Sequence, residues 1–143
     1  MVNARIERAQ DLDGTPRVLA CFDLSEAEFA AAAHAVAAVR ADRFRIAEMS
    51  SDDVLAMREL TAVADELADR SRQGGAAAFV VPPARLNALH DALAAFVESR
   101  DFAEWIREED REPLALVRGL VWPLEDLGAE ALRAALESPA PRT

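Results

Sequence analysis

The stretch Phe22-Asp23-Leu24-Ser25-Glu26-Ala27-Glu28-Phe29 decides the fold, because an extended run ends and a helix begins within it. Ser25 and Glu28 have the spacing of a capping box, in which the hydroxyl accepts from one amide and the carboxylate accepts from the other. Apolar residues flank the box where a hydrophobic staple would place them. A helix is therefore predicted over residues 26–40, directly after a strand.

Upstream of this boundary the pattern predicts a β-hairpin over residues 2–24. Apolar and polar side chains alternate over residues 2–6, which is typical of a strand. The segment Asp-Leu-Asp-Gly-Thr-Pro at 11–16 is a turn cluster, and an apolar run around Cys21 follows. That run is the second strand, and a thiol within it acts most often as a small hydrophobe.

Downstream, helical spacing of apolar residues alternates with short extended runs. The predicted elements are an extended segment at 42–49, a helix at 50–72, a strand at 76–81, a helix at 83–99, a short helix at 101–110 and a last helix from Pro113 that Pro123 kinks or breaks. We expect one α+β, predominantly helical domain over residues 1–138. Its four main helices pack on a small antiparallel sheet of two to four strands, and residues 139–143 form a tail.

The two halves of the chain read alike at an offset of 57 to 60 residues. Residues 17–72 and 76–137 would each be a strand followed by two long helices, related by a pseudo-twofold axis. Chance register between amphipathic helices explains the same likeness, so both interpretations stay open.

The composition limits the chemistry that the chain can perform. It has no lysine, no tyrosine, one cysteine and two histidines, and these four types supply most enzymatic nucleophiles and bases. The serines at 25, 50 and 51 are explained as helix caps, and Gly74-Gly75 lacks the lysine of a phosphate-binding loop. We predict no catalytic residue, no bound metal and no cofactor.

The charge balance bears on partners and location. Sixteen arginines against 26 acidic residues leave a net charge of −10, spread over both halves. This disfavours binding to nucleic acid and to anionic membranes, because both rest on a basic surface. A lone cysteine and the absence of a signal-peptide pattern favour the cytoplasm. Abundant alanine and arginine in place of lysine are typical of a GC-rich, bacterial coding sequence.

Five acidic residues lie together at Glu104, Glu108, Glu109, Asp110 and Glu112. On a helix, Glu104 and Glu108 would share a face and could touch a divalent cation. Arginines interleaved at complementary spacing favour a solvated face held by salt bridges instead.

Two functions from different classes follow. The first is a non-enzymatic interaction or regulatory module that forms a homodimer, or binds another protein, through its amphipathic helices. Its predicted interface is Trp105, Ile106, Leu114, Val117 and Val121. The second is a small-ligand or divalent-metal binding protein with a site between helices. Its predicted ligand-binding residues are His34, His90, Arg118 and Trp122.

Overall fold

In the computed structural model, which describes residues 1–43 and 50–137, a β-hairpin opens the chain. Its strands β1 (Val2–Gln10) and β2 (Pro16–Leu24) are antiparallel. The turn is closed by a 2.9 Å hydrogen bond from the Asp11 amide to the Thr15 carbonyl, and Gly14 adopts a φ of 83° within it. The hairpin predicted from the sequence is thereby confirmed.

Four helices and one further strand follow. They are α1 (Glu26–Arg43), α2 (Ser51–Gln73), β3 (Ala77–Val81), α3 (Pro83–Asp101) and α4 (Glu108–Glu137). The predicted capping box begins α1: the Ser25 hydroxyl accepts from the Glu28 amide at 3.1 Å, and the Glu28 carboxylate accepts from the Ser25 amide at 2.9 Å. Ser50 and Asp53 make the same box at the start of α2.

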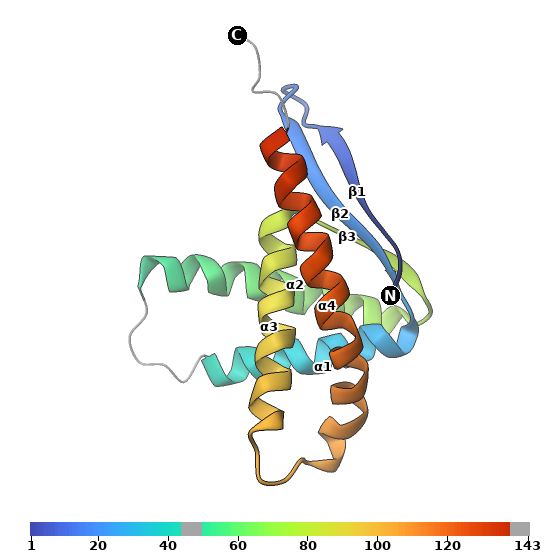
Figure 1. Cartoon of the computed structure of the whole chain (residues 1–143), viewed down its shortest axis with the longest axis vertical. Coiled ribbons are helices and arrows are strands. Elements are labelled where there is room, and N and C mark those ends of the chain that lie inside the picture. Colours follow the sequence, from blue (N-terminus) through green and yellow to red (C-terminus); the bar gives the residue numbers. More distant parts are fainter. Residues whose placement is uncertain (44–49, 138–143) are drawn as a thin grey trace.

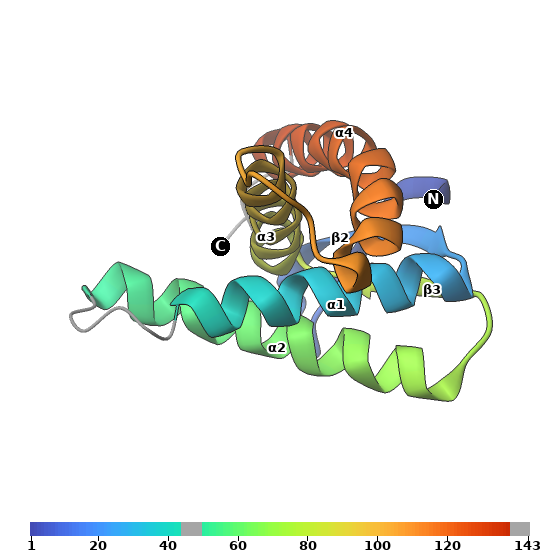
Figure 2. The same cartoon turned by 90° about the horizontal axis from the view of Figure 1, so that it is seen from below.

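The helices pack on a three-stranded antiparallel sheet of order β1-β2-β3. Figure 1 shows α3 and α4 side by side, with α1 and α2 running across behind them and the sheet beside α4. Seen from below, α1 lies between α2 and the α3–α4 pair (Figure 2), and it contacts all three other helices. The predicted helical α+β fold is confirmed.

The core lies between the helices and one face of the sheet. Phe22 on β2 and Phe79 on β3 are opposite each other, with ring centroids 5.6 Å apart, and Phe29 on α1 meets Phe79 at 6.0 Å. All three rings are edge to face, a favourable geometry for aromatic side chains. Cys21 points to the other face of the sheet, yet it is fully buried, because Glu7 and Arg5 of β1 lie close to it.

The chain order also places β2-α1-α2 before β3-α3-α4. Phe22 and Phe79, which the predicted repeat aligns, are register partners in the sheet. This is the order of elements that a duplication of residues 17–72 and 76–137 requires, and the duplication itself stays a prediction.

Three predicted elements differ from the structure. The extended segment at 42–49 is wrong at its start, since α1 continues to Arg43, and residues 44–49 lie outside the described residues. The short helix at 101–110 and the start at Pro113 are replaced by one helix that begins at Glu108. Pro123 does not break that helix, because Leu120 and Leu124, on either side of it, are both buried and hold the two parts against the core, and the other predicted outcome, a kink at Pro123, stays a prediction.

Candidate functional site

A polar cluster joins three helices at the start of α4. Asp110 is 5% exposed and is the one buried charged residue among residues 1–43 and 50–137. Its carboxylate lies 2.6 Å from His34 Nε2 on α1 and accepts a 3.2 Å hydrogen bond from Arg100 Nε on α3. Both partners also contact Phe96, His34 edge to face and Arg100 with its guanidinium 4.5 Å from the ring centroid. The cluster therefore ties α1, α3 and α4 to one buried carboxylate.

The electrostatics of the cluster favour an ionised Asp110. Burial alone raises the pKa of this carboxyl group, but the hydrogen bond from His34 and the positive charge of Arg100 outweigh burial, so the pKa lies below its usual range. Because its pKa is lowered in the folded chain, Asp110 contributes to the stability of the fold in its ionised form. His34 and Arg100 both contact the Asp110 carboxylate, and they thereby hold the start of α4 in place.

A polar hollow of about 520 Å³ lies beside the cluster, and Asp110, Arg100, Ser99 and Trp105 line it. An aspartate–histidine pair supports nucleophilic catalysis when a nucleophile stands within hydrogen-bond reach of the histidine. The hydroxyl here belongs to Ser99, and it donates to the Phe96 carbonyl at 2.9 Å and accepts from Arg100 at 2.8 Å. The hydroxyl is thus used within α3, and we call Asp110 with its partners His34 and Arg100, which hold three helices together, the Asp110 clamp.

A groove follows the outer seam between α3 and α4. Towards the C-terminal end of α4 it holds a hollow of about 280 Å³ lined by Leu86, His90 and Leu132. Towards the α3–α4 connection it holds a second hollow of about 480 Å³ beside Phe102 and Trp122. Both hollows take their walls from the same two helices. They are two separate hollows along one antiparallel helix pair, and we call the seam that contains them the groove.

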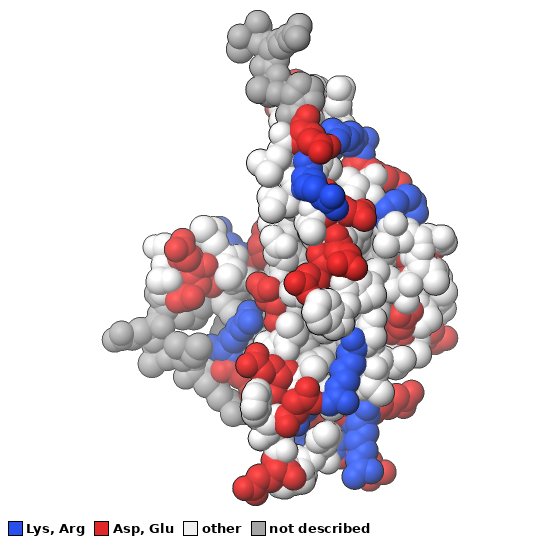
Figure 3. Space-filling view, in the orientation of Figure 1, with Lys and Arg blue, Asp and Glu red and all other residues white. Residues whose placement is uncertain are grey.

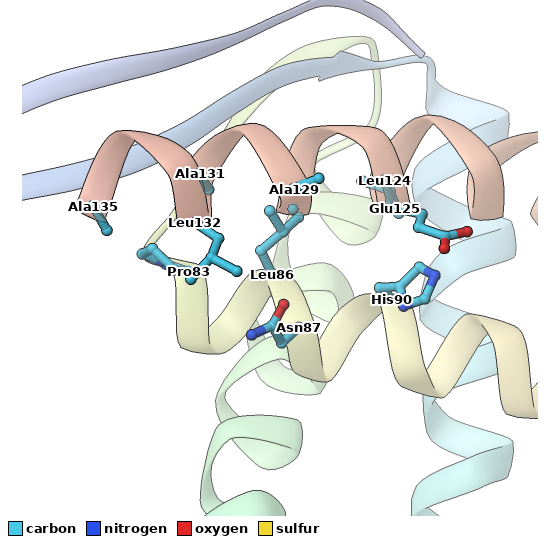
Figure 4. Close-up of a pocket in the computed structure, with 11 residues that line it drawn as sticks. Pro83, Leu86, Asn87, His90, Leu124, Glu125, Ala129, Ala131, Leu132 and Ala135 are labelled. Atoms are coloured by element: carbon cyan, nitrogen blue, oxygen red, sulfur yellow. The ribbon is translucent and has the colours of Figure 1, made fainter. Parts of the chain in front are cut away.

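His90 is the polar feature of this groove. Figure 4 shows its imidazole beside the Glu125 side chain, between α3 and α4. Its Nδ1 lies 3.4 Å from the Asp91 carboxylate, whereas its Nε2 is buried and has no hydrogen-bond partner among the described residues. Leaving such an atom unsatisfied costs about 1–3 kcal/mol. The groove therefore has a mainly apolar wall that contains one buried ring nitrogen, His90 Nε2, without a hydrogen-bond partner among the described residues.

Large apolar side chains are exposed along the same face. Trp122 is 70% exposed, Leu132 61%, Leu136 77% and Phe102 83%. Figure 3 shows this face of the molecule, where acidic side chains and arginines are interspersed with uncharged surface. We call the surface formed by Phe102, Trp122, Leu132, Leu136 and the groove between them the outer α3–α4 face.

The four predicted ligand-binding residues lie at three different places. His34 belongs to the Asp110 cluster, His90 lines the smaller hollow of the groove, and Arg118 and Trp122 line the larger one. Arg118 is paired there with Asp101. None of the three described hollows contains both histidines, so the structure does not bring the set together.

The predicted interface residues divide into exposed and buried ones. Trp105 is 69% exposed, and Ile106 and Val121 are half-buried. Leu114 and Val117 are 3% and 0% exposed and belong to the core, so packing within the chain leaves them unavailable to a partner. That part of the predicted interface is corrected by the fold.

Two features of the site were missed from the sequence. Asp110 was included in a solvated acidic face, and no local signal separates it from its neighbours, since its partners come from distant helices. The second apolar stripe of α4 did have a signal: Trp122, Ala129, Leu132 and Leu136 recur at spacings of three, four and seven.

Among the described residues no three His, Cys, Asp or Glu side chains lie together as a metal site. None of the helices, over the residues described, combines the length and apolar character needed to cross a membrane. Compared with known proteins, the chain matches no protein-family model, no curated protein and no solved structure.

Proposed function

We propose that this chain is a non-enzymatic interaction module that self-associates in the cytoplasm through its outer α3–α4 face. The observation that carries the proposal is the double apolar character of α4. One stripe, which includes Leu120, Leu124 and Leu127, is buried in the core. The other, which includes Trp122 and Leu132, faces outward. A helix on the surface of a monomer ordinarily has one apolar stripe and one polar face.

A second copy of the chain fits the outer stripe, because the large residues at its two ends, Trp122 and Leu136, are symmetric about Ala129. In an antiparallel crossing at that residue, Trp122 lies opposite the partner's Leu136, seven residues away on either side. Glu125 lies opposite the partner's Arg133, four residues away on either side. Within residues 1–43 and 50–137 neither of these two charged residues has a salt-bridge partner of its own. At these positions a two-fold contact pairs the two apolar residues with each other and the two opposite charges with each other, while Leu132 lies beside Asp126 of the second copy.

The centre of the stripe also suits close helix packing. Ala129 is at the symmetry point and Gly128 is next to it, and both are small, whereas Glu130 follows on the other side. Small side chains at the crossing point let two helices approach to the short end of the 8–10 Å range of interaxial distances. The groove beside them, with its unpartnered His90 Nε2, would be covered by the second copy.

The other parts of the molecule support a binding role better than catalysis. Among the described residues Asp110 is the one buried acidic residue, and both its carboxylate oxygens have partners, His34 and Arg100. The alternative, a small-ligand or divalent-metal binding protein, loses support because its four predicted residues lie at three places. A single cysteine that is buried and a net charge of −10 agree with the cytoplasm and with a protein partner rather than nucleic acid.

The test measures mass in solution by light scattering after gel filtration. The unaltered chain should elute as a multiple of its 15.5 kDa. Leu132→Glu places charge in the outer face and should lower that mass. Leu55→Glu is the matched control, because Leu55 on α2 is 58% exposed against 61% for Leu132. Equal masses for the two variants would refute the proposed function.

A further inference from the structure

Strand β1 is an edge strand with a free side. It pairs with β2, and within the described part of the chain no other strand pairs with it. Figure 1 shows it at the margin of the molecule, with β2 between it and α4. All its residues are exposed except Ile6, which is half-buried. A free, extended edge is a template for a further strand, and proteins commonly protect it.

The direction of each backbone group on β1 follows from the hairpin. The Asp11 amide donates to the Thr15 carbonyl, and the next register pair contains Pro16, which has no amide to donate. Because bonded and non-bonded pairs alternate in an antiparallel ladder, the odd-numbered residues over 5–9 point their amides and carbonyls at β2. The even-numbered residues over 6–10 point theirs at the free edge.

The side chains of β1 are self-complementary about Ile6. When a second β1 runs antiparallel and is centred on Ile6, each Arg5 lies opposite the partner's Glu7, and each Ala4 lies opposite the partner's Arg8. Arg5 and Glu7 are on the same face of the sheet and already pair within the strand at 3.0 Å. They occupy non-bonded positions of the new ladder, where opposed side chains come closest.

We propose that β1 pairs in this way with β1 of a second copy, so that two three-stranded sheets join into one of six strands. The ladder is centred on Ile6, whose amide and carbonyl both point outward to meet those of the partner's Ile6. The ladder ends at Asn3, where the register of β1 with β2 shifts and φ is 52°. The Asn3 side-chain amide donates a 2.6 Å hydrogen bond to the Asp23 carboxylate there. The bulge limits pairing to residues 4–8.

This contact is separate from the outer α3–α4 face and does not rest on it. The two surfaces belong to different elements, so both can be occupied at once. The unaltered chain would then form assemblies of at least four copies, and loss of either surface would leave dimers held by the other. Variants of each surface distinguish the two proposals.

The test reverses the charges of Glu7 and Arg5 on β1 in a protein that already carries Leu132→Glu. The mass of each variant is measured by sedimentation velocity. We expect Leu132→Glu alone to be a dimer, and addition of Glu7→Arg to give a monomer, because Arg5 then faces a second arginine. Further addition of Arg5→Glu restores opposite charges and should restore the dimer. Arg5 and Glu7 are about half exposed, so the fold tolerates the exchange, which circular dichroism checks.

Amide hydrogen exchange gives a direct second readout. In the Leu132→Glu protein, the amides of Ile6 and Arg8 should exchange at least tenfold more slowly than in the monomer obtained with Glu7→Arg. The amides that face β2 should change little between these proteins. A monomeric Leu132→Glu protein, or a dimer that Glu7→Arg leaves intact with Ile6 unprotected, would overturn the β1 proposal. Neither result would affect the outer-face proposal, which depends on the loss of mass caused by Leu132→Glu.

Discussion

Truncation of Trp122 to alanine should weaken self-association by about three orders of magnitude. The side chain is 70% exposed, and a tryptophan presents up to about 250 Å², so about 170 Å² is open to a partner. At about 25 cal/mol per Å², complete coverage would contribute about 4 kcal/mol, and coverage of half of it about 2 kcal/mol. A two-fold contact uses the residue twice, which gives about 4 kcal/mol per dimer and about 1,000-fold in Kd.

The assay is a dilution series followed by sedimentation equilibrium, with Trp105→Ala as the control. Trp105 is 69% exposed, so the two variants remove the same side chain from equally open positions. Both should change the free energy of unfolding by less than about 0.5 kcal/mol, because neither position is in the core. Equal weakening of association by Trp105→Ala and Trp122→Ala would refute this role of Trp122 in the outer α3–α4 face, and so would a dissociation constant for Trp122→Ala equal to that of the unaltered chain.

Three further outcomes are expected from the fold. Asp110→Asn should lower the free energy of unfolding by about 2 kcal/mol at neutral pH. Because the folded pKa is depressed, that difference should vanish as the pH falls from about 4 through the folded pKa, and denaturation by urea at several pH values measures it. Gly74→Ala should destabilise by about 1 kcal/mol, since φ is 72° and the added carbon meets Glu26 at 3.3 Å, whereas Gly119→Ala, with open space in α4, should stabilise by about 1 kcal/mol in thermal unfolding. Cys21 should be alkylated on the order of 100-fold more slowly in the folded than in the unfolded chain, because burial and the Glu7 carboxylate raise the pKa of its thiol.

The sequence was sufficient for elements whose signals are local. The caps at Ser25 and Ser50, the hairpin turn and the Gly74 stop each involve residues within a few positions of one another, and all are present in the structure. The start of α4 was missed for the opposite reason. It is fixed by contacts from Asp110 to two other helices, and such contacts leave no pattern in a local window of sequence.

The difference between local signals and long-range contacts also explains which site residues could be predicted. The spacing that predicts an amphipathic helix identifies apolar stripes without saying which one faces inward. Leu114 and Val117 were therefore assigned to an interface, although they form the inner stripe of α4. Trp122, which the sequence analysis assigns to a ligand site, lies on the outer stripe and lines the larger hollow, so that assignment stays a prediction. Tertiary packing decides between the stripes, and the sequence of one helix does not contain that information.

The Asp110 clamp and the two association surfaces are physically connected. The clamp fixes where α4 begins relative to α1 and α3, and thereby sets the seam on which the groove and Trp122 lie. Each surface is self-complementary about one residue, Ala129 on α4 and Ile6 on β1, so each generates its own two-fold axis. Two such axes close into a tetramer only if they meet at right angles. Axes that meet at other closing angles give larger closed assemblies, and axes that do not meet build an open chain. A mass that stops rising at four copies with increasing concentration would therefore indicate perpendicular axes, and one that keeps rising would indicate a filament.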